Sequence, residues 1–492
     1  MRMYTENFLA LFKLNAKIAP VTTTEQIPAP SKAADPKVAQ IPLPLRPGLT
    51  ILGVDEDQPG VPPPLRLFIA FNHRIMPQAD DTACWTDSRA YEAWLQRYGR
   101  LLPEAEVVWE DIESDAALWR WATHGMCAQG LERAGEGAAP DEVDGFVLRN
   151  EFMADYEVRA PFERFGGDAW FDATGKPTRI HLHGKDIRPG EPGWERAKFV
   201  VRSSSAVWAA IVDHFAEAHF TICNQAVLAS AQHLPPTHPL RRVIKPFLFH
   251  TPGANGATPL LLFPEWGLLH RTFPFTWAGF QHLLKDAFAP RPMVNFVDDL
   301  RRKRVHPEQA PGVDLAFFTE GTAWWEILEK FSHAIVRDSE GFNGYADDPA
   351  VKAWWGALGP DMTAGRTLAD GLADVLGQLF CTATAFHAQA QNAGTYLRDP
   401  AFFSARLVPG INRANKEALH ALCTLFCSAG LPTPMITGDL ARHMPDAGSK
   451  AAALALKADI DALDLAMSAR NSARRWPYRL LEPHRVALSI TV

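Results

Sequence analysis

Residues 213–219 read DHFAEAH, and this stretch decides which fold we expect. His214 and His219 lie five residues apart in a helical, otherwise largely apolar region. On an ideal α-helix, five residues turn through roughly 500°, which leaves the two side chains about 140° apart. In a π-type widening, where residue i bonds to residue i+5, the two side chains nearly eclipse. The spacing is therefore either accidental or part of a π-bulged, metal-binding helix.

A second helical stretch repeats the pattern. Residues 385–392 read AFHAQAQN, so His387 is followed five residues later by Asn392, which can also bind a metal. A single histidine on an apolar helix is usually a hydrogen-bonded core residue, but three on two such helices favour a metal site. Neutral imidazoles with few thiolates suit iron, manganese or zinc rather than an iron–sulfur cluster.

Further segments make the chain resemble the catalytic domain of lipoxygenases. No single segment is specific, but their order and spacing are similar to that family over about residues 114–492. The segments are Ser114–Asp115 with Leu118–Trp119, Trp194–Lys198, His214 with His219, His238–Pro239, Val297–Leu300, Trp325–Ile327, Asp347–Trp355, His387–Ala388, Asn392–Tyr396, Trp476–Pro483 and Ser489–Val492.

The resemblance implies one non-haem metal ion per chain with five protein ligands, iron being expected and manganese the alternative. Carried over onto this chain, the ligands are His214, His219, His387, Asn392 and the terminal carboxylate of Val492. The family usually ends in isoleucine, and a terminal valine leaves the carboxylate unchanged.

The sequence departs from the family pattern in two further places. The family spaces its third histidine and its asparagine four apart, whereas Asn392 follows His387 by five and Gln391 takes the +4 position. Either Gln391 replaces the asparagine or a one-residue bulge brings Asn392 into place; the matching residues after Asn392 favour the bulge. Residues 252–259, PGANGATP, are expected to be irregular where the family has a regular helix.

The resemblance also implies an activity. The chain would be an oxidoreductase, a dioxygenase that inserts O2 into a polyunsaturated fatty acid or lipid-like substrate after hydrogen abstraction from an activated methylene. A metal-bound hydroxide takes the hydrogen atom in that chemistry, so no further catalytic side chain is expected. Two alternatives remain: a specialised oxidase or hydroperoxide-converting enzyme with the same fold and metal, or a non-catalytic, metal-free relative.

The remaining pattern predicts a mainly α fold: a lipoxygenase-like catalytic domain with central long helices and a minor β patch. Glycine-rich residues 162–193 predict a small sheet or hairpin, and the apolar tail 476–492 predicts an extended segment buried against the body. Apolar residues at three- and four-residue spacing predict helices at 88–102, 114–131, 194–233, 321–337, 365–396, 411–429 and 448–474.

Proline content predicts the domain boundary. Residues 20–64 hold eleven of the 39 prolines, and proline fixes the backbone and removes a hydrogen-bond donor. We therefore expect residues 1–64 to form a Pro-rich N-terminal arm and residues 65–492 to form the lipoxygenase-like catalytic domain, in a compact form without the family's β-sandwich.

Composition sets the remaining expectations. The 492 residues are 47% hydrophobic with a net charge of −7, which suits a soluble globular chain and gives no basic footprint for nucleic acid. No apolar run reaches about 18 residues and no clear signal peptide begins the chain, so we expect no transmembrane segment and a cytoplasmic location. The six scattered cysteines predict no disulfide framework.

The expected partners are a small lipid-like substrate and O2. The basic run Arg301–Arg304 is either a solvated loop or a contact for a lipid or substrate carboxylate, which would allow transient membrane contact. His181 and His183 form an HxH pair on an expected strand, but no partner carboxylates on further strands follow, so we do not expect a second metal site there.

Overall fold

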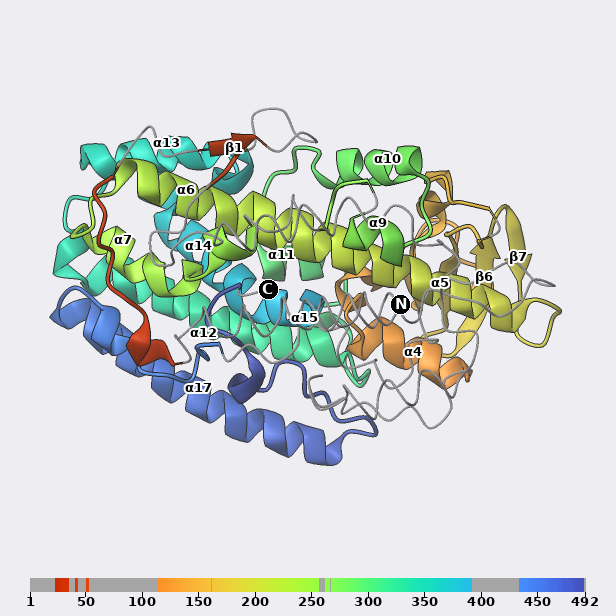
Figure 1. The fold of residues 1–492 in the computed structure, drawn as a ribbon. Helices are drawn as coiled ribbons and strands as arrows, with labels where there is room; N and C mark the ends of the chain where they lie inside the picture. Colours follow the sequence, from red (N-terminus) through yellow and green to blue (C-terminus); the bar gives the residue numbers. More distant parts are fainter. Residues whose placement is uncertain are drawn as a thin grey trace, which may run out of the picture.

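The computed structural model describes residues 23–34, 40–42, 50–52, 114–160, 162–255, 262–265, 267–391 and 433–490. Within these ranges helices dominate. β1 (Gln40–Pro42) and β2 (Thr50–Leu52) form a two-stranded sheet, and a five-stranded sheet lies at an end of the molecule (Figure 1). The predicted mainly α fold with a minor β patch is confirmed. The helices expected at 88–102 and 411–429 lie outside the described residues, and so does most of the arm 1–64, so the predicted domain boundary stays a prediction.

The ends of the helices predicted at 194–233, 321–337 and 448–474 lie within five residues of the observed ones, whereas several further helices lie outside the predicted ranges. None in the described ranges has the length and apolar composition that a membrane span requires. Two are π-helical segments, η7 (Ala209–Cys223) and η11 (Thr382–Phe386). The α-helices are α4 (Asp115–His124), α5 (Trp194–Trp208), α6 (Asn224–His233), α7 (Pro239–Ile244), α9 (Leu268–Thr272), α10 (Trp277–Ala287), α11 (Phe296–Arg302), α12 (Ala316–Asp338), α13 (Pro349–Thr363), α14 (Leu368–Cys381), α15 (His387–Gln391) and α17 (Ala447–Ala473).

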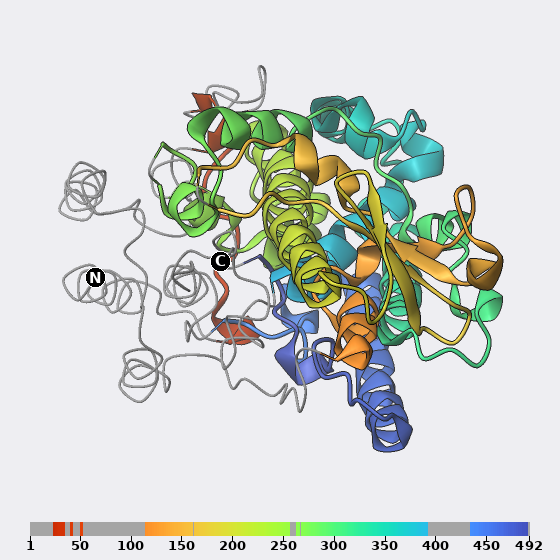
Figure 2. The ribbon, with the colours of Figure 1, turned by 90° about the vertical axis from the view of Figure 1, so that its right-hand side faces the viewer.

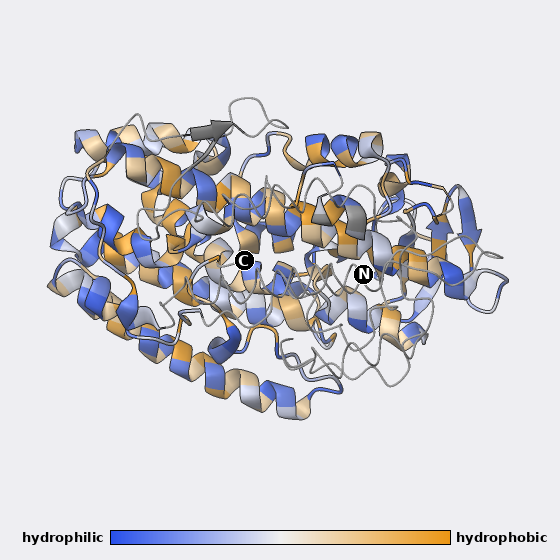
Figure 3. Cartoon of the chain, in the orientation of Figure 1, coloured by the Kyte–Doolittle hydropathy of each residue, from blue (hydrophilic) through white to orange (hydrophobic). Residues whose placement is uncertain are grey.

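The first central rod consists of α5, η7 and α6, which follow one another without a break (Figure 1). Twelve of the fifteen residues of η7 are buried. A helix that is apolar on all sides is stable only when other elements surround it. Figure 3 shows polar and apolar residues alternating along the outer helix α17.

The second central rod consists of α14, η11 and α15. It begins where the Thr367 side chain accepts a hydrogen bond from the Asp370 amide, which caps α14. Both η11 and α15 contact η7, and α12 packs along α14. The two π-helical segments, one on each rod, therefore lie next to each other in the middle of the molecule.

The sheet has five antiparallel strands in sequence order: β3 (Leu131–Arg133), β4 (Phe146–Leu148), β5 (Asp168–Phe171), β6 (Pro177–Leu182) and β7 (Lys185–Ile187). It therefore begins about thirty residues before the predicted range 162–193, because β3 and β4 have only three residues each and show no alternation. Figure 2 views the molecule from the end where the sheet lies beside α4 and α5.

The helix predicted at 114–131 ends early, at His124. The Gly125 amide donates to the Trp121 carbonyl, and a Cβ atom on Gly125 would lie 2.3 Å from that oxygen. Only glycine allows this close approach, so the chain turns here and continues through a 3₁₀ turn into β3.

Two of the family-like segments meet where α4 contacts α5. The Asp115 carboxylate accepts hydrogen bonds from Trp194 Nε1 at 2.8 Å and from Lys198 Nζ at 2.9 Å. Lys198 is only 2% exposed, and a buried ammonium group is stable only when it is paired. The two family-like segments around residues 115 and 194–198, which are far apart in the sequence, therefore contact each other and connect α4 to α5.

The C-terminal segment returns into the body, as predicted. Leu481, Val486 and Ile490 are fully buried, and Trp324 Nε1 donates to the Leu481 carbonyl at 2.8 Å. Residues 434–436 pair with residues 486–488 through backbone hydrogen bonds. The segment is thus held along its length as far as residue 490, and residues 491–492 lie outside the described part of the chain.

Candidate metal centre

Three histidine rings converge where the two central rods touch. The Nε2 atoms of His214 and His387 are 3.0 Å apart, those of His214 and His219 are 3.2 Å apart, and those of His219 and His387 are 3.1 Å apart. All three side chains are at most 3% exposed. The structure thus brings together the three histidines that the sequence singled out.

The π-helical backbone is what allows this arrangement. His214 and His219 both lie within η7, where i to i+5 bonding places residues five apart on the same side. His387 follows directly after η11, the π-helical segment of the second rod. Of the two interpretations of the five-residue spacing, the π-bulged helix is the one that the structure has.

Asn255 fixes the orientation of the His219 ring. Its Nδ2 donates to the His219 carbonyl oxygen at 3.0 Å, and its Oδ1 lies 2.9 Å from His219 Nδ1. A carbonyl oxygen only accepts, so the amide nitrogen must face it and the amide oxygen must face the ring. His219 Nδ1 is therefore the donor, and the Nε2 lone pair points toward the other two histidines.

Asn255 lies on a segment that was predicted to be irregular. Residues 251–255 are helical, which contradicts the expectation for the first part of 252–259; residues 256–261 lie outside the described residues. Pro252 is in the first turn, where a proline costs no backbone hydrogen bond. Sequence reasoning missed this residue because proline and glycine were taken to exclude a helix.

The three histidines fit a metal ion. Nitrogen atoms separated by 3.0 to 3.2 Å lie about 1.8 Å from their common centre. Metal–imidazole bonds are about 2.0–2.1 Å long, so one ion can reach all three atoms with little movement. Among the described residues they are also the one buried cluster with the spacing of metal ligands.

The other two expected ligands, Asn392 and Val492, lie outside the described residues. Gln391 is the last residue of α15 and is half-buried. Which of Gln391 and Asn392 binds the metal therefore remains a prediction, and so does the terminal carboxylate.

The remaining histidines considered from the sequence have structural contacts. His238 caps α7, accepting from the Leu240 amide, and its Nε2 lies 3.1 Å from Asp348 Oδ2. His181 lies on β6 and contacts Asp186, whereas His183 lies in the following turn with φ 49° and contacts the Phe165 carbonyl.

Two carboxyl groups lie next to the histidines on η7. Burial, and then the nearby Glu217, raise the pKa of Asp213 to about 7, although a hydrogen bond from Gln129 opposes this shift. Burial is also the largest cause of the raised pKa of Glu217. Both groups therefore hold a proton more readily than exposed acids, which reduces the negative charge buried beside the metal centre.

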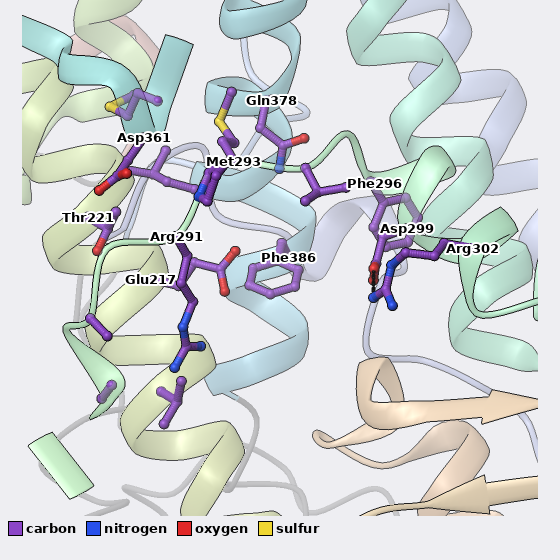
Figure 4. A pocket seen from close by; sticks show the side chains of 17 residues that line it. Glu217, Thr221, Arg291, Met293, Phe296, Asp299, Arg302, Asp361, Gln378 and Phe386 are labelled. Atoms are coloured by element: carbon purple, nitrogen blue, oxygen red, sulfur yellow. Dashed lines mark hydrogen bonds and ion pairs between the residues drawn. The ribbon is translucent and has the colours of Figure 1, made fainter. Parts of the chain in front are cut away.

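A cavity of about 330 Å³ lies beside these groups (Figure 4). Both rods line it, with Thr221 from η7, Gln378 from α14 and Phe386 from η11. The buried Gln378 Oε1 has no hydrogen-bond partner among the described residues, so it could accept a hydrogen bond from a water molecule. The charged lining residues are Glu217, Asp299, Asp361, Arg291 and Arg302.

Comparisons with known proteins bear on the fold of the chain. No family model matches the sequence. The linolenate 9R-lipoxygenase of Nostoc sp. (strain PCC 7120 / SAG 25.82 / UTEX 2576) is 28% identical over 153 residues, which is 31% of this chain. The match spans about a fifth, 19%, of that relative's length.

Solved structures match over far more of the chain. The manganese lipoxygenase of Gaeumannomyces graminis covers 93% of this chain, over 96% of its own, with a TM-score of 0.68 and 14% identity. Coral 8R-lipoxygenase covers 78% of this chain, over 67% of its own, with a TM-score of 0.67 and 14% identity. The delta413-417:GS LOX, solved with arachidonate, covers 94% of this chain, over 84% of its own, with a TM-score of 0.73 and 13% identity. The chain therefore has the fold of a lipoxygenase catalytic domain.

Proposed function

We propose that this protein is a mononuclear non-haem metal dioxygenase that inserts O2 into a polyunsaturated fatty acid or a lipid-like substrate. The convergence of His214, His219 and His387 within a lipoxygenase-like fold is the observation that carries the proposal. A relative named as a linolenate lipoxygenase and a structural neighbour solved with arachidonate support the substrate class.

Iron is the proposed metal, with manganese as the alternative that one structural neighbour uses. The three histidines would hold it together with Asn392, or Gln391 in its place, and the terminal carboxylate of Val492. Burial of the C-terminal segment as far as Ile490 supports the terminal carboxylate as a ligand, because the two residues that follow Ile490 continue from a buried position.

The bound metal would supply the one-electron chemistry that abstracts a hydrogen atom from an activated methylene. The residues of the chain prepare the site for it. Asn255 holds the His219 tautomer that presents Nε2 to the metal. The buried rods keep bulk water away from the three imidazoles, since none is more than 3% exposed.

The test measures metal content and oxygen uptake together. We expect about one iron or manganese ion per chain and oxygen consumption with linoleate, both lost in His214→Ala. His181→Ala, which removes a half-exposed histidine from the sheet, is the matched control and should retain both. Metal without oxygen uptake would favour the specialised oxidase, and a wild-type protein free of metal after growth with iron would refute the proposal.

A further inference from the structure

A second group of side chains with the donor atoms of metal ligands lies on the outside of the molecule, away from the three histidines. Glu329 and His333 are on α12 and Asp374 is on α14, and one ligand atom from each lies within 4.8 Å of the others. His333 Nε2 is 3.1 Å from Asp374 Oδ1. We propose that these three residues form a zinc site that joins α12 to α14.

The backbone fixes the relative positions of the three residues. Glu329 and His333 are four apart on one helix, so they share a face. Gly377, one turn after Asp374, lies close against α12: a Cβ atom there would be 3.0 Å from Ser332 Oγ and 3.5 Å from the Cα of Glu329. The ligands therefore come from two rigid elements in tight contact rather than from loops.

Another side chain already orients one of the two carboxylates. Arg366 Nη1 donates to Asp374 Oδ2 at 2.6 Å, which leaves Oδ1 directed toward His333. Supporting contacts of this kind hold metal-binding carboxylates in place in known sites.

The two carboxylates of the site repel each other, although Arg366 already pairs with Asp374. Burial is the largest cause of the raised pKa of Glu329, and the Asp374 carboxylate also raises it. Lys330, the nearby lysine on α12, instead pairs with Asp459 on α17 at 2.7 Å. A cation between Glu329 and Asp374 would offset the repulsion between the two carboxylates.

The ligand set points to zinc. One imidazole with two carboxylates suits zinc, whereas magnesium and calcium prefer oxygen atoms alone. Tetrahedral zinc with bonds of about 2.1 Å would place its ligand atoms roughly 3.4 Å apart. The His333–Asp374 pair is already that close, and His333 is 51% exposed, so the side chains can move the remaining distance.

Binding to the folded state alone raises the thermal midpoint. The full-length protein, loaded with its own metal, should therefore bind one further equivalent of Zn²⁺ and unfold at a higher temperature. Mg²⁺ and Ca²⁺ should have no such effect.

The variants separate this site from the inner one. His333→Ala and Asp374→Asn should each weaken this binding by at least about tenfold. The control is His282→Ala on α10, which removes an exposed histidine that faces a single carboxylate, Asp286, at 3.5 Å. Full zinc binding should persist in His214→Ala, where the inner site is broken.

Three results would overturn the proposal. One is wild-type protein that takes up no zinc beyond its own metal. Another is uptake that His333→Ala and Asp374→Asn leave unchanged. The third is uptake that is lost equally in His282→Ala, which would indicate unspecific surface binding.

Discussion

At the scale of the residue, Asn255 holds His219 by two hydrogen bonds, one to the ring and one to the backbone of the same residue. We expect Asn255→Ala to fold but to bind the metal about 10–100-fold more weakly, because the ring loses the partner that fixes its tautomer. Competition with a chelator of known affinity measures this change.

Asn295→Ala is the matched control, since Asn295 caps α11 on the surface and has no contact with the histidines. It should leave metal affinity unchanged. Equal metal affinity in Asn255→Ala and wild-type protein would show that the packing of the rods alone orients the His219 ring.

His250 makes folding depend on pH. Burial, and then Lys245, lower its pKa from 6.5 to about 4. As the pH falls, His250 therefore takes up a proton in the unfolded chain before it does so in the folded one. The stability that the neutral His250 side chain contributes is present above pH 6.5 and is lost as the pH falls toward 4. The loss is about 3 kcal/mol over this interval.

The variant that tests this is His250→Asn, because the backbone here has φ 67°, a conformation that asparagine tolerates. Urea unfolding between pH 4 and 7 should show a smaller loss of stability in the variant than in wild-type protein. The exposed His484→Asn should behave like wild-type protein. If the unfolding free energy of His250→Asn fell with pH as steeply as that of wild-type protein, other groups would cause the pH dependence.

The residues of the candidate site were predictable to different degrees. The spacing of His214 and His219 carried the signal, because five residues place two side chains together only on a π-helix. Asn255 carried none, since one asparagine between glycines usually belongs to a turn and its role depends on η7 lying beside it. Local patterns predict ligands of one element but not the partners that tertiary packing brings to them.

At the scale of the element, Gln389 connects α15 to two other segments. It is fully buried, donates to the Gly125 carbonyl after α4, and accepts a hydrogen bond from the Tyr478 hydroxyl of the C-terminal segment. Tyr478→Phe would leave Gln389 Oε1 without this donor. We expect the variant to lose about 1–3 kcal/mol of unfolding free energy.

Tyr345→Phe is the matched control, because the Tyr345 hydroxyl donates to the Ala369 carbonyl in an exposed position where water can replace it. Denaturant unfolding should give a much smaller loss for it. Equal losses in the two variants would mean that the buried bond does not hold the C-terminal segment.

Elements differed in how well the sequence predicted them. The range expected for the first rod, 194–233, was correct because its apolar pattern is long and regular. β3 and β4 were missed because three residues cannot show alternation, and they exist through their pairing with each other and with β5. The end of α4 depends on the contact of Gly125 with Trp121, which no periodicity reveals.

At the scale of the whole molecule, the candidate metal centre joins the two central rods. His214 and His219 come from one rod and His387 from the other. A metal that binds only the folded state stabilises it by about 4 kcal/mol when its concentration is a thousand times its dissociation constant. Removal by a chelator should therefore lower the midpoint of unfolding.

Removal of the metal should destabilise both rods, because each rod supplies part of the site and the two rods contact each other through η7, η11 and α15. Hydrogen exchange should become faster in η7 and in η11 together, while the sheet from β3 to β7, which lies at the end of the molecule, changes little. His214→Ala should be insensitive to the chelator, since its site is already broken. Faster exchange in one rod alone, or an unchanged midpoint in wild-type protein, would mean that packing of the apolar rods, and not the metal, holds the centre of the molecule together.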